Sequence, residues 1–281
     1  MTKRPLPPIR DVTWRLWVAY LGTPYVGWQK QPGLPSIESA LQEAFLQLTS
    51  MSPELVAAGR TDSGVHAQGQ VVSCRFESRF DSHKLRLALS SALPRQISVW
   101  KADEMPHGFH AKRQSIGKRY LYRIHPGPTS SPFSWETSWH IRQPLDLQAM
   151  QEAAAFFIGE HDFESFRSAN CQAAHARRYI WQVELSIDKN LIVVDIRGNA
   201  FCHNMVRIMV GTLVDVGYGK IKPHDVKSIL EAKDRTLAGK TAPPHGLTLD
   251  TIYYPDDLTS SNIPKDAKFP RYPVTKDTLP W

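Results

Sequence analysis

A single acidic residue in a glycine-rich segment has the setting that carboxylate chemistry needs. The stretch "AAGRTDSGVHAQGQ", residues 57–70, contains Asp62, with Arg60 two positions before it and glycines on both sides. Glycine adopts backbone conformations closed to other residues, so such a turn can present a side chain in a fixed direction. A guanidinium nearby would favour the ionised carboxylate, which can act as a nucleophile or a base. The alternative is a turn in which Asp62 only accepts backbone hydrogen bonds.

Two other carboxylate chemistries fit this segment less well. The triplet Asp-Ser-Gly that begins at Asp62 matches that of aspartic proteases, in which two such carboxylates share one proton. The chain has one copy, so a protease would have to be a homodimer, and Arg60 would oppose a shared proton. A glycosidase needs two acids that flank the scissile bond. Glu54 and Glu77 are available, but nothing pairs either of them with Asp62.

The composition bounds the class of protein that could carry this site. The 281 residues suffice for one large domain or two coupled ones, and 42% apolar with 22% charged residues is typical of a globular protein. No apolar run reaches the ~18 residues of a membrane helix, and the N-terminus has no signal-peptide pattern. Three widely spaced cysteines fit a reducing compartment, so we expect a cytoplasmic protein without membrane association.

The charge balance indicates a polyanionic partner. The chain has 34 basic and 27 acidic side chains, a net charge of +7, and nucleic acid is the commonest polyanion. The four basic residues of 256–281 are balanced by four acidic ones, so the excess lies on the rest of the chain. Neither a Walker loop nor a GxGxxG after a strand is present, which disfavours a nucleotide cofactor.

Strand and helix patterns alternate along the chain and predict an α+β protein with two related halves. The halves meet at a loop near 105–117, which gives residues 1–110, residues 111–255 and a proline-containing tail at 256–281. Alternating or β-branched runs predict strands at 13–20, 70–76, 97–105, 119–125, 178–187, 190–201 and 247–255. Helical spacing and capping residues predict helices after Ser36, from Asp81 or Ser82 to before Pro94, from Asp146 to Gly159, at 203–216 and after Pro223.

Six ordered motifs carry a more specific resemblance. "GRTDSGVHAQGQV" looks like the central motif of the tRNA pseudouridine synthase I family, known as TruA. The other five resemble further motifs of that family over roughly residues 13–255. They are "GTPYVGWQKQ", "FHAKRQSIGKRYLYRI", the pair "WHIRQPLDLQAM" and "GEHDFESFRSANC", "IRGNAFCHNMVRIMVGTLVDVG", and "APPHGLTLDTIYYP".

The resemblance implies both a fold and a reaction. The fold would be that of pseudouridine synthases, with a mostly antiparallel sheet and helices on one face in each half, around a central cleft. The reaction would isomerise uridine to pseudouridine at positions 38, 39 or 40 of the tRNA anticodon arm, without a metal or a cofactor. The family acts as a homodimer with tRNA lying across both subunits. A catalytically idle RNA-binding module on the same scaffold is the alternative.

The resemblance also assigns roles to single residues. Asp62 would be the catalytic group, Tyr120 the platform under a flipped-out uracil and Leu247 a second apolar wall. Arg207 would pair with Asp62; a structural ion pair with another acid, such as Asp215, is the alternative. Tyr120 could instead be an ordinary core residue of its strand. Arg60 would hold the flipped nucleotide's phosphate or wedge into the RNA stem, unless it is only a solvated surface charge.

Basic residues are the candidates for RNA contact, and histidines for metal binding. Clusters of Lys and Arg bind backbone phosphates with little sequence readout, although they can equally be a solvated strand face. The expected contacts are Lys112, Arg113, Lys118, Arg119, Arg177 and Arg178. Four histidines match no zinc spacing, so no metal site is expected, and His66 and His110 are expected to support loops by hydrogen bonds.

Overall fold

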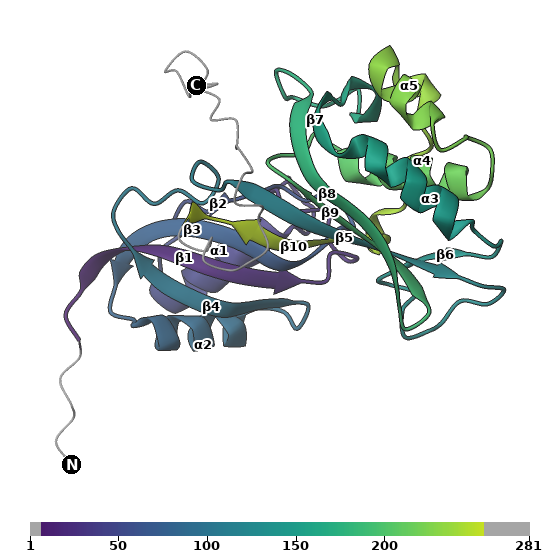
Figure 1. Ribbon diagram of the computed structural model, residues 1–281. Helices are drawn as coiled ribbons and strands as arrows, with labels where there is room; N and C mark the ends of the chain where they lie inside the picture. Colours follow the sequence, from purple (N-terminus) through teal and green to yellow (C-terminus); the bar gives the residue numbers. More distant parts are fainter. Residues whose placement is uncertain (1–6, 256–281) are drawn as a thin grey trace.

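A computed structural model describes residues 7–255, which form five α-helices, ten strands and four short 3₁₀ turns (Figure 1). The strands are β1 (Arg10–Tyr20), β2 (Val56–Ala57), β3 (His66–Ser78), β4 (Ile97–Met105), β5 (Gly117–Pro126), β6 (Trp139–Ile141), β7 (Gly159–Asp162), β8 (Arg177–Asp188), β9 (Leu191–Gly198) and β10 (Leu247–Tyr253). The helices are α1 (Ile37–Thr49), α2 (Ser82–Ala92), α3 (Leu147–Ala154), α4 (Met205–Gly217) and α5 (Asp225–Ala232). The expected tail at 256–281 lies outside the described residues.

Local sequence signals set the helix starts. Ser36 caps α1 in a capping box, in which its side chain accepts from the Ser39 amide and the Ser39 hydroxyl accepts from the Ser36 amide. Asp81 and Asp146 cap α2 and α3 by accepting from the amides three residues ahead. The predicted helix starts are therefore confirmed to within two residues.

One continuous sheet runs through both halves of the chain. Its strand order is β4-β1-β3-β10-β5-β9-β8-β7, with β2 paired to β3 and β6 to β5. The last strand within residues 7–255, β10, lies at the centre, parallel to β3 and antiparallel to β5. It therefore joins the strands of the first half to those of the second, which makes the sheet a single layer (Figure 1).

The α+β class is confirmed, and most predicted strands are present. The β8–β9 hairpin turns at Lys189 and Asn190, both with positive φ (46° and 69°), the pattern of a type I′ turn. The short strands β2, β6 and β7 were not predicted, because two to four residues carry too little periodicity. The expected boundary between 1–110 and 111–255 falls in the connection from β4 to β5, and the division into two domains stays a prediction.

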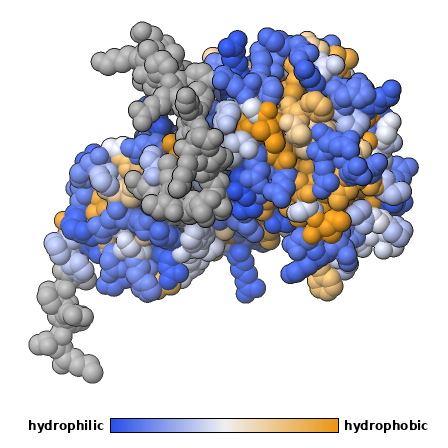
Figure 2. All heavy atoms as spheres, viewed as in Figure 1, coloured by the Kyte–Doolittle hydropathy of each residue, from blue (hydrophilic) through white to orange (hydrophobic). Residues whose placement is uncertain are grey.

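Helices cover the sheet at both ends, and the core lies between. Helix α2 packs against β4 and α1 in the first half, while α3 packs against β8 and α4 in the second (Figure 1). In α4, Met205, Ile208 and Met209 are all buried. On the face shown in Figure 2, hydrophilic side chains predominate, and apolar ones gather over the half that carries α3 to α5. None of the helices within residues 7–255 is long and apolar enough to cross a membrane.

Candidate active site

A tight turn fixes the backbone at Asp62. The Val65 amide donates to the Asp62 carbonyl at 3.1 Å, and Gly64 at the third position has φ +77°, the geometry of a type II turn. Gly64 also lies against Pro244, which comes just before β10: a Cβ at residue 64 would be 3.0 Å from the ring. A larger residue at 64 would therefore strain the turn and displace the segment that leads into β10.

The N-terminal loop holds the same turn from the other side. Gly27, with φ +102°, lies so close that a Cβ there would be 2.5 Å from the Thr61 carbonyl oxygen. The Trp28 amide donates to that oxygen at 3.1 Å, and the hydroxyls of Tyr20 and Thr61 are 2.8 Å apart. Burial raises the pKa of Tyr20 to about 12, so this phenol stays protonated as a hydrogen-bonding group.

Two buried side chains connect the turn to the rest of the sheet. The Gln70 amide donates to the Gly59 carbonyl at 2.6 Å. The His66 Nδ1 accepts from the Gly22 amide at 3.0 Å, so its Nε2 carries the proton and faces the carbonyls of Glu136 and His245 at 2.9 and 3.0 Å. Burial lowers the pKa of His66 and keeps the ring neutral. His66 therefore supports the loop by hydrogen bonds, as the sequence led us to expect.

One expectation about the turn is wrong. Gly59 does not have a positive φ, unlike Gly64, so left-handed backbone does not explain it. Its lack of a side chain instead makes room: a Cβ at residue 59 would be 3.0 Å from Cε of Lys118. The glycine therefore serves a close approach between the turn and β5.

Arg207 of α4 is the guanidinium that lies against Asp62. Its Nη1 is 3.4 Å from the Asp62 Oδ2, and the side chain is fixed by bonds to the Ala242 carbonyl (2.7 Å) and the Asn204 side chain (2.8 Å). The Asp62 side chain is 27% exposed, so the carboxylate reaches the surface. The alternative partner Asp215 pairs instead with Lys220 at 3.0 Å.

Arg60 does not take part in this contact. Its side chain is exposed and makes no hydrogen bond or ion pair with any residue in 7–255. The expectation that Arg60 lies against Asp62 is therefore wrong, and Arg207 is the guanidinium that contacts the carboxylate. An exposed guanidinium beside the turn remains available to a ligand.

His203 is a neighbour of Asp62 that was expected at most as a metal ligand. Its Nε2 is 3.4 Å from the Asp62 Oδ1, the oxygen that Arg207 does not approach. The residue before α4, Asn204, has φ 61°, which turns the chain so that His203 faces the carboxylate. His203 lies before the helix, so helical spacing gave no signal for this neighbour, and only the backbone turn at Asn204 brings it to Asp62.

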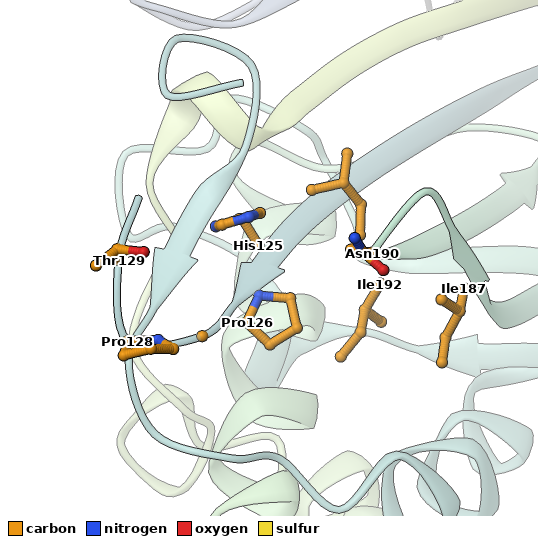
Figure 3. A pocket seen from close by; sticks show the side chains of 9 residues that line it. His125, Pro126, Pro128, Thr129, Ile187, Asn190 and Ile192 are labelled. Atoms are coloured by element: carbon orange, nitrogen blue, oxygen red, sulfur yellow. The ribbon is translucent and has the colours of Figure 1, made fainter. Parts of the chain in front are cut away.

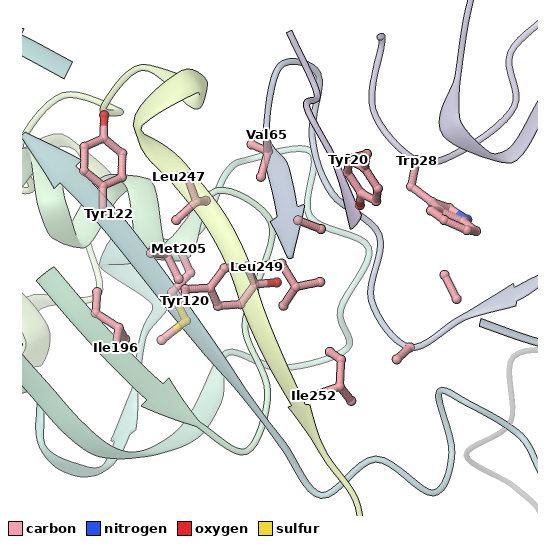
Figure 4. Packing of buried hydrophobic residues seen from close by; sticks show 14 of the residues in the cluster. Tyr20, Trp28, Val65, Tyr120, Tyr122, Ile196, Met205, Leu247, Leu249 and Ile252 are labelled. Atoms are coloured by element: carbon pink, nitrogen blue, oxygen red, sulfur yellow. The ribbon is translucent and has the colours of Figure 1, made fainter. Parts of the chain in front are cut away.

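Tyr120 lies in β5 between Leu249 of β10 and Ile196 of β9 (Figure 4). It is 8% exposed, and its ring meets Phe201 edge-on at 5.0 Å between centroids. Burial and, second, the Asp62 charge raise the pKa of Tyr120, which places its hydroxyl within electrostatic reach of the carboxylate. The residue is thus both a core tyrosine and a neighbour of Asp62.

Leu247 begins β10 next to Tyr122 of β5. It is 5% exposed and lies among the buried residues between the two halves (Figure 4). Tyr122 donates to the Pro243 carbonyl at 2.8 Å, which holds the segment before β10 in place. Leu247 lies opposite Tyr122, two residues from Tyr120, so Leu247 and Tyr120 leave the same face of the central strands.

The six predicted RNA contacts divide into three groups. The exposed ones are Lys112, Arg113 and Arg177. Arg119 forms ion pairs with Asp195 (2.9 Å) and Asp250 (3.2 Å), which speaks against RNA contact. The half-buried Lys118 lies beside the turn of Asp62, and Arg178 is buried; neither has a carboxylate partner within the described part of the chain.

Neither a metal site nor the pocket in Figure 3 competes with this site. Within residues 7–255, no three His, Cys, Asp or Glu side chains are grouped so that they could hold a metal ion. The pocket in Figure 3 lies at the end of β5 and the β8–β9 hairpin, between His125, Ile187 and Asn190. None of the predicted site residues lines it.

Known proteins are similar to this chain over most of its length. The tRNA pseudouridine synthase family profile matches residues 153–255. The tRNA pseudouridine synthase A of Syntrophotalea carbinolica is 42% identical over 244 residues, 86% of this chain and 97% of that protein. Those of Allorhizobium ampelinum and Geobacter sulfurreducens are 40% and 42% identical, covering 87% and 86% of this chain and 95% and 99% of theirs. Among solved structures, an archaeal box H/ACA sRNP Nop10–Cbf5 complex is similar at 12% identity, with a TM-score of 0.31 over 79% of this chain and 68% of that chain.

Proposed function

Because this chain belongs to the tRNA pseudouridine synthase A family and is an isomerase of tRNA uridine, we propose that Asp62 is its catalytic carboxylate. The target is one or more of positions 38, 39 and 40 in the anticodon arm. The contact of Asp62 with Arg207 carries the proposal: a partly exposed carboxylate accepts from the Arg207 guanidinium of α4 through one oxygen. Its other oxygen lies 3.4 Å from the His203 ring, and the side chain is 27% exposed.

The reaction breaks the N1–C1′ bond, rotates the uracil and joins C5 to C1′. The C5 proton is lost and N1 gains one, so no oxidant or other co-reactant is needed. Attack on C1′, addition to C6 and abstraction of the 2′ proton all require an ionised carboxylate against the nucleotide. The Arg207 guanidinium lies 3.4 Å from that carboxylate, and its bonds to Ala242 and Asn204 hold it in place.

A uridine in a stem must leave the base stack before its glycosidic bond can meet Asp62. In this proposal Tyr120 is the platform for the flipped uracil, and Leu247 is an apolar wall beside it. Tyr120 is mostly buried, so the platform would be preformed and the ring would not have to swing out. Arg60, exposed two residues from Asp62, would hold RNA near the vacated position.

The exposed cations Lys112, Arg113 and Arg177 would grip phosphates of the tRNA backbone with strong salt dependence. We further propose a cytoplasmic homodimer with the tRNA across both subunits. Light scattering during gel filtration tests the dimer; a monomer at micromolar concentration would refute it.

One experiment tests the proposed function directly. The protein is incubated with unmodified tRNA transcript, and pseudouridine is mapped at single-nucleotide resolution. We expect product at positions 38 to 40 and none with Asp62→Asn, which keeps the shape of the side chain. Product elsewhere in the tRNA would refute the assigned position, and full turnover by Asp62→Asn would refute the assigned residue.

A further inference from the structure

Lys118 and Arg178 share one face of the sheet with the active site. In β5, Lys118 is two residues from Tyr120, so both side chains leave the same face. Lys118 lies opposite Gly198 of β9, which lies opposite Ile180 of β8, and Arg178 is two residues before Ile180. Since directly opposed residues share a face, Lys118 and Arg178 point to the same side, with a glycine between them.

Lys118 lies next to the turn of Asp62, and the charge of Arg178 reaches the segment before α4. The Lys118 side chain crosses Gly59, three residues before Asp62, at the close approach described above. The Arg178 charge acts on Cys202, the residue before His203, where it partly offsets the rise that burial causes in the pKa of that thiol. Lys118 of β5 thus lies against the segment that carries Asp62, and Arg178 of β8 acts on the segment that leads to His203 and Arg207.

No described carboxylate compensates these charges. Burial, with the charges of Lys112 and Arg178, lowers the pKa of Lys118 to about 8, and no acid is among the causes. Arg178 is 8% exposed, and its Nε is buried without a hydrogen-bond partner among residues 7–255. Its Nη1 is used by the carbonyls of His175 and Arg177 at 3.0 and 2.6 Å, which fix the guanidinium in place.

We propose that Lys118 and Arg178 form a binding site for one phosphodiester of the RNA, the phosphate on the 5′ or the 3′ side of the target uridine. A buried cation without an acid partner is costly and is retained where an anion arrives. RNA is the anion that this protein must bind, so the inference rests on the proposed function. The phosphate would fix the sugar of the flipped nucleotide against Asp62, which supplies the alignment that the reaction requires.

The test removes the negative charge of one phosphate next to the target uridine and the positive charge of Lys118, first separately and then together. Full-length tRNA is ligated with one neutral methylphosphonate on the 5′ or the 3′ side of the target uridine. For the wild-type protein we expect kcat/KM to fall about tenfold or more at one of the two positions. In Lys118→Met the unmodified tRNA should lose a similar factor, and the methylphosphonate should then cause less than about twofold further loss.

Arg177→Gln is the matched control, because Arg177 is the neighbour of Arg178 on β8 and is exposed. It should weaken both tRNAs by the same factor and keep the methylphosphonate effect. The proposal is overturned if neither methylphosphonate slows the wild-type protein, or if Lys118→Met keeps the full discrimination. Failure of the proposed function would look different, because the wild-type protein would then form no pseudouridine at positions 38 to 40 of the unmodified tRNA.

Stability gives a second readout that separates a phosphate site from a structural lysine. Removal of an uncompensated buried cation should raise the melting temperature of Lys118→Met while its activity falls. A variant that melts lower than the wild-type protein would show that Lys118 serves the fold, and would overturn the proposal.

Discussion

Lys118 and Arg119 are neighbours in β5, yet they lie in opposite electrostatic surroundings. Arg119 leaves one face of the sheet and meets Asp195 and Asp250, and Arg197 pairs with the same Asp195 at 2.7 Å. Lys118 leaves the other face and meets no acid of the described chain. At this point of β5, the cation on one face of the sheet is therefore paired with acids, and the cation on the other face, Lys118, has no acidic partner among the described residues. A positive charge alone is therefore a poor indicator of RNA contact. The better indicator is the absence of an acidic partner, because only such a cation is free to bind a phosphate.

The largest effect should come from the active-site face. Asp62→Asn removes the charge and keeps the volume, so turnover should fall by orders of magnitude while tRNA affinity stays within about threefold. Single-turnover assays and filter binding measure the two quantities separately. Near-normal turnover of Asp62→Asn would show that Asp62 is not catalytic, and would contradict the difference in function drawn between the two faces of the sheet.

The next largest effect should be a loss of folding stability on the face where Arg119 and Arg197 pair with Asp195. Asp195→Asn leaves Arg119 and Arg197 without their shared acid, and we expect about 2–3 kcal/mol lower free energy of unfolding because the carboxylate is largely buried. Turnover per folded molecule should stay within about twofold. Urea denaturation and kinetics at low temperature measure these. A selective loss of turnover would mean that the two faces are coupled.

A smaller effect should appear in the pH dependence of stability. The pKa of Lys118 is lowered to about 8 in the folded protein, so between pH 8 and the ordinary lysine value of 10.5 the unfolded chain binds more protons. Stability from this group therefore rises with pH across that window. At pH 7, Lys118→Met should be about 1–2 kcal/mol more stable than the wild-type protein, after allowance for partial exposure, and the difference should shrink towards pH 10. A constant difference would contradict an uncompensated lysine.

The smallest effect should come from the Tyr120 hydroxyl. Tyr120→Phe keeps the ring and its contact with Phe201, so we expect less than about fivefold loss of kcat, whereas Tyr120→Ala should lose far more. Equal activity of the two variants would mean that the ring is not a stacking platform. Melting temperatures of both variants are the control for lost packing.

The sequence predicted what local chemistry determines. Three helix starts were predicted correctly, at Ser36, Asp81 and Asp146, because an N-cap hydrogen bond involves only residues within one turn of the helix. The contact of Arg207 with Asp62 was expected from family resemblance rather than from spacing, since 145 residues separate the two. Periodicity alone gives no information at that distance.

Tertiary pairing explains the failures. Gly59 was assigned a special backbone, but the reason for the glycine is the Lys118 side chain from another strand. Arg60 was placed at Asp62 because it is near in sequence, although its side chain points to solvent and Arg207 occupies the position. Strand alternation predicts that Lys118 and Arg119 point to opposite faces of the sheet. It does not reveal the two acids that pair with Arg119, because Asp195 lies on β9 and Asp250 at the bulge of β10.

The central position of β10 has a consequence for folding during synthesis of the chain. Thr248 and Leu249 pair with β3 on one side, and residues 247–253 pair with β5 on the other. A chain synthesised only as far as α5 lacks the strand that pairs with both β3 and β5, and therefore lacks the sheet connection between the segment of Asp62 and Tyr120. We expect the active site to be completed only after residues 247–253 have been made and have paired with both strands.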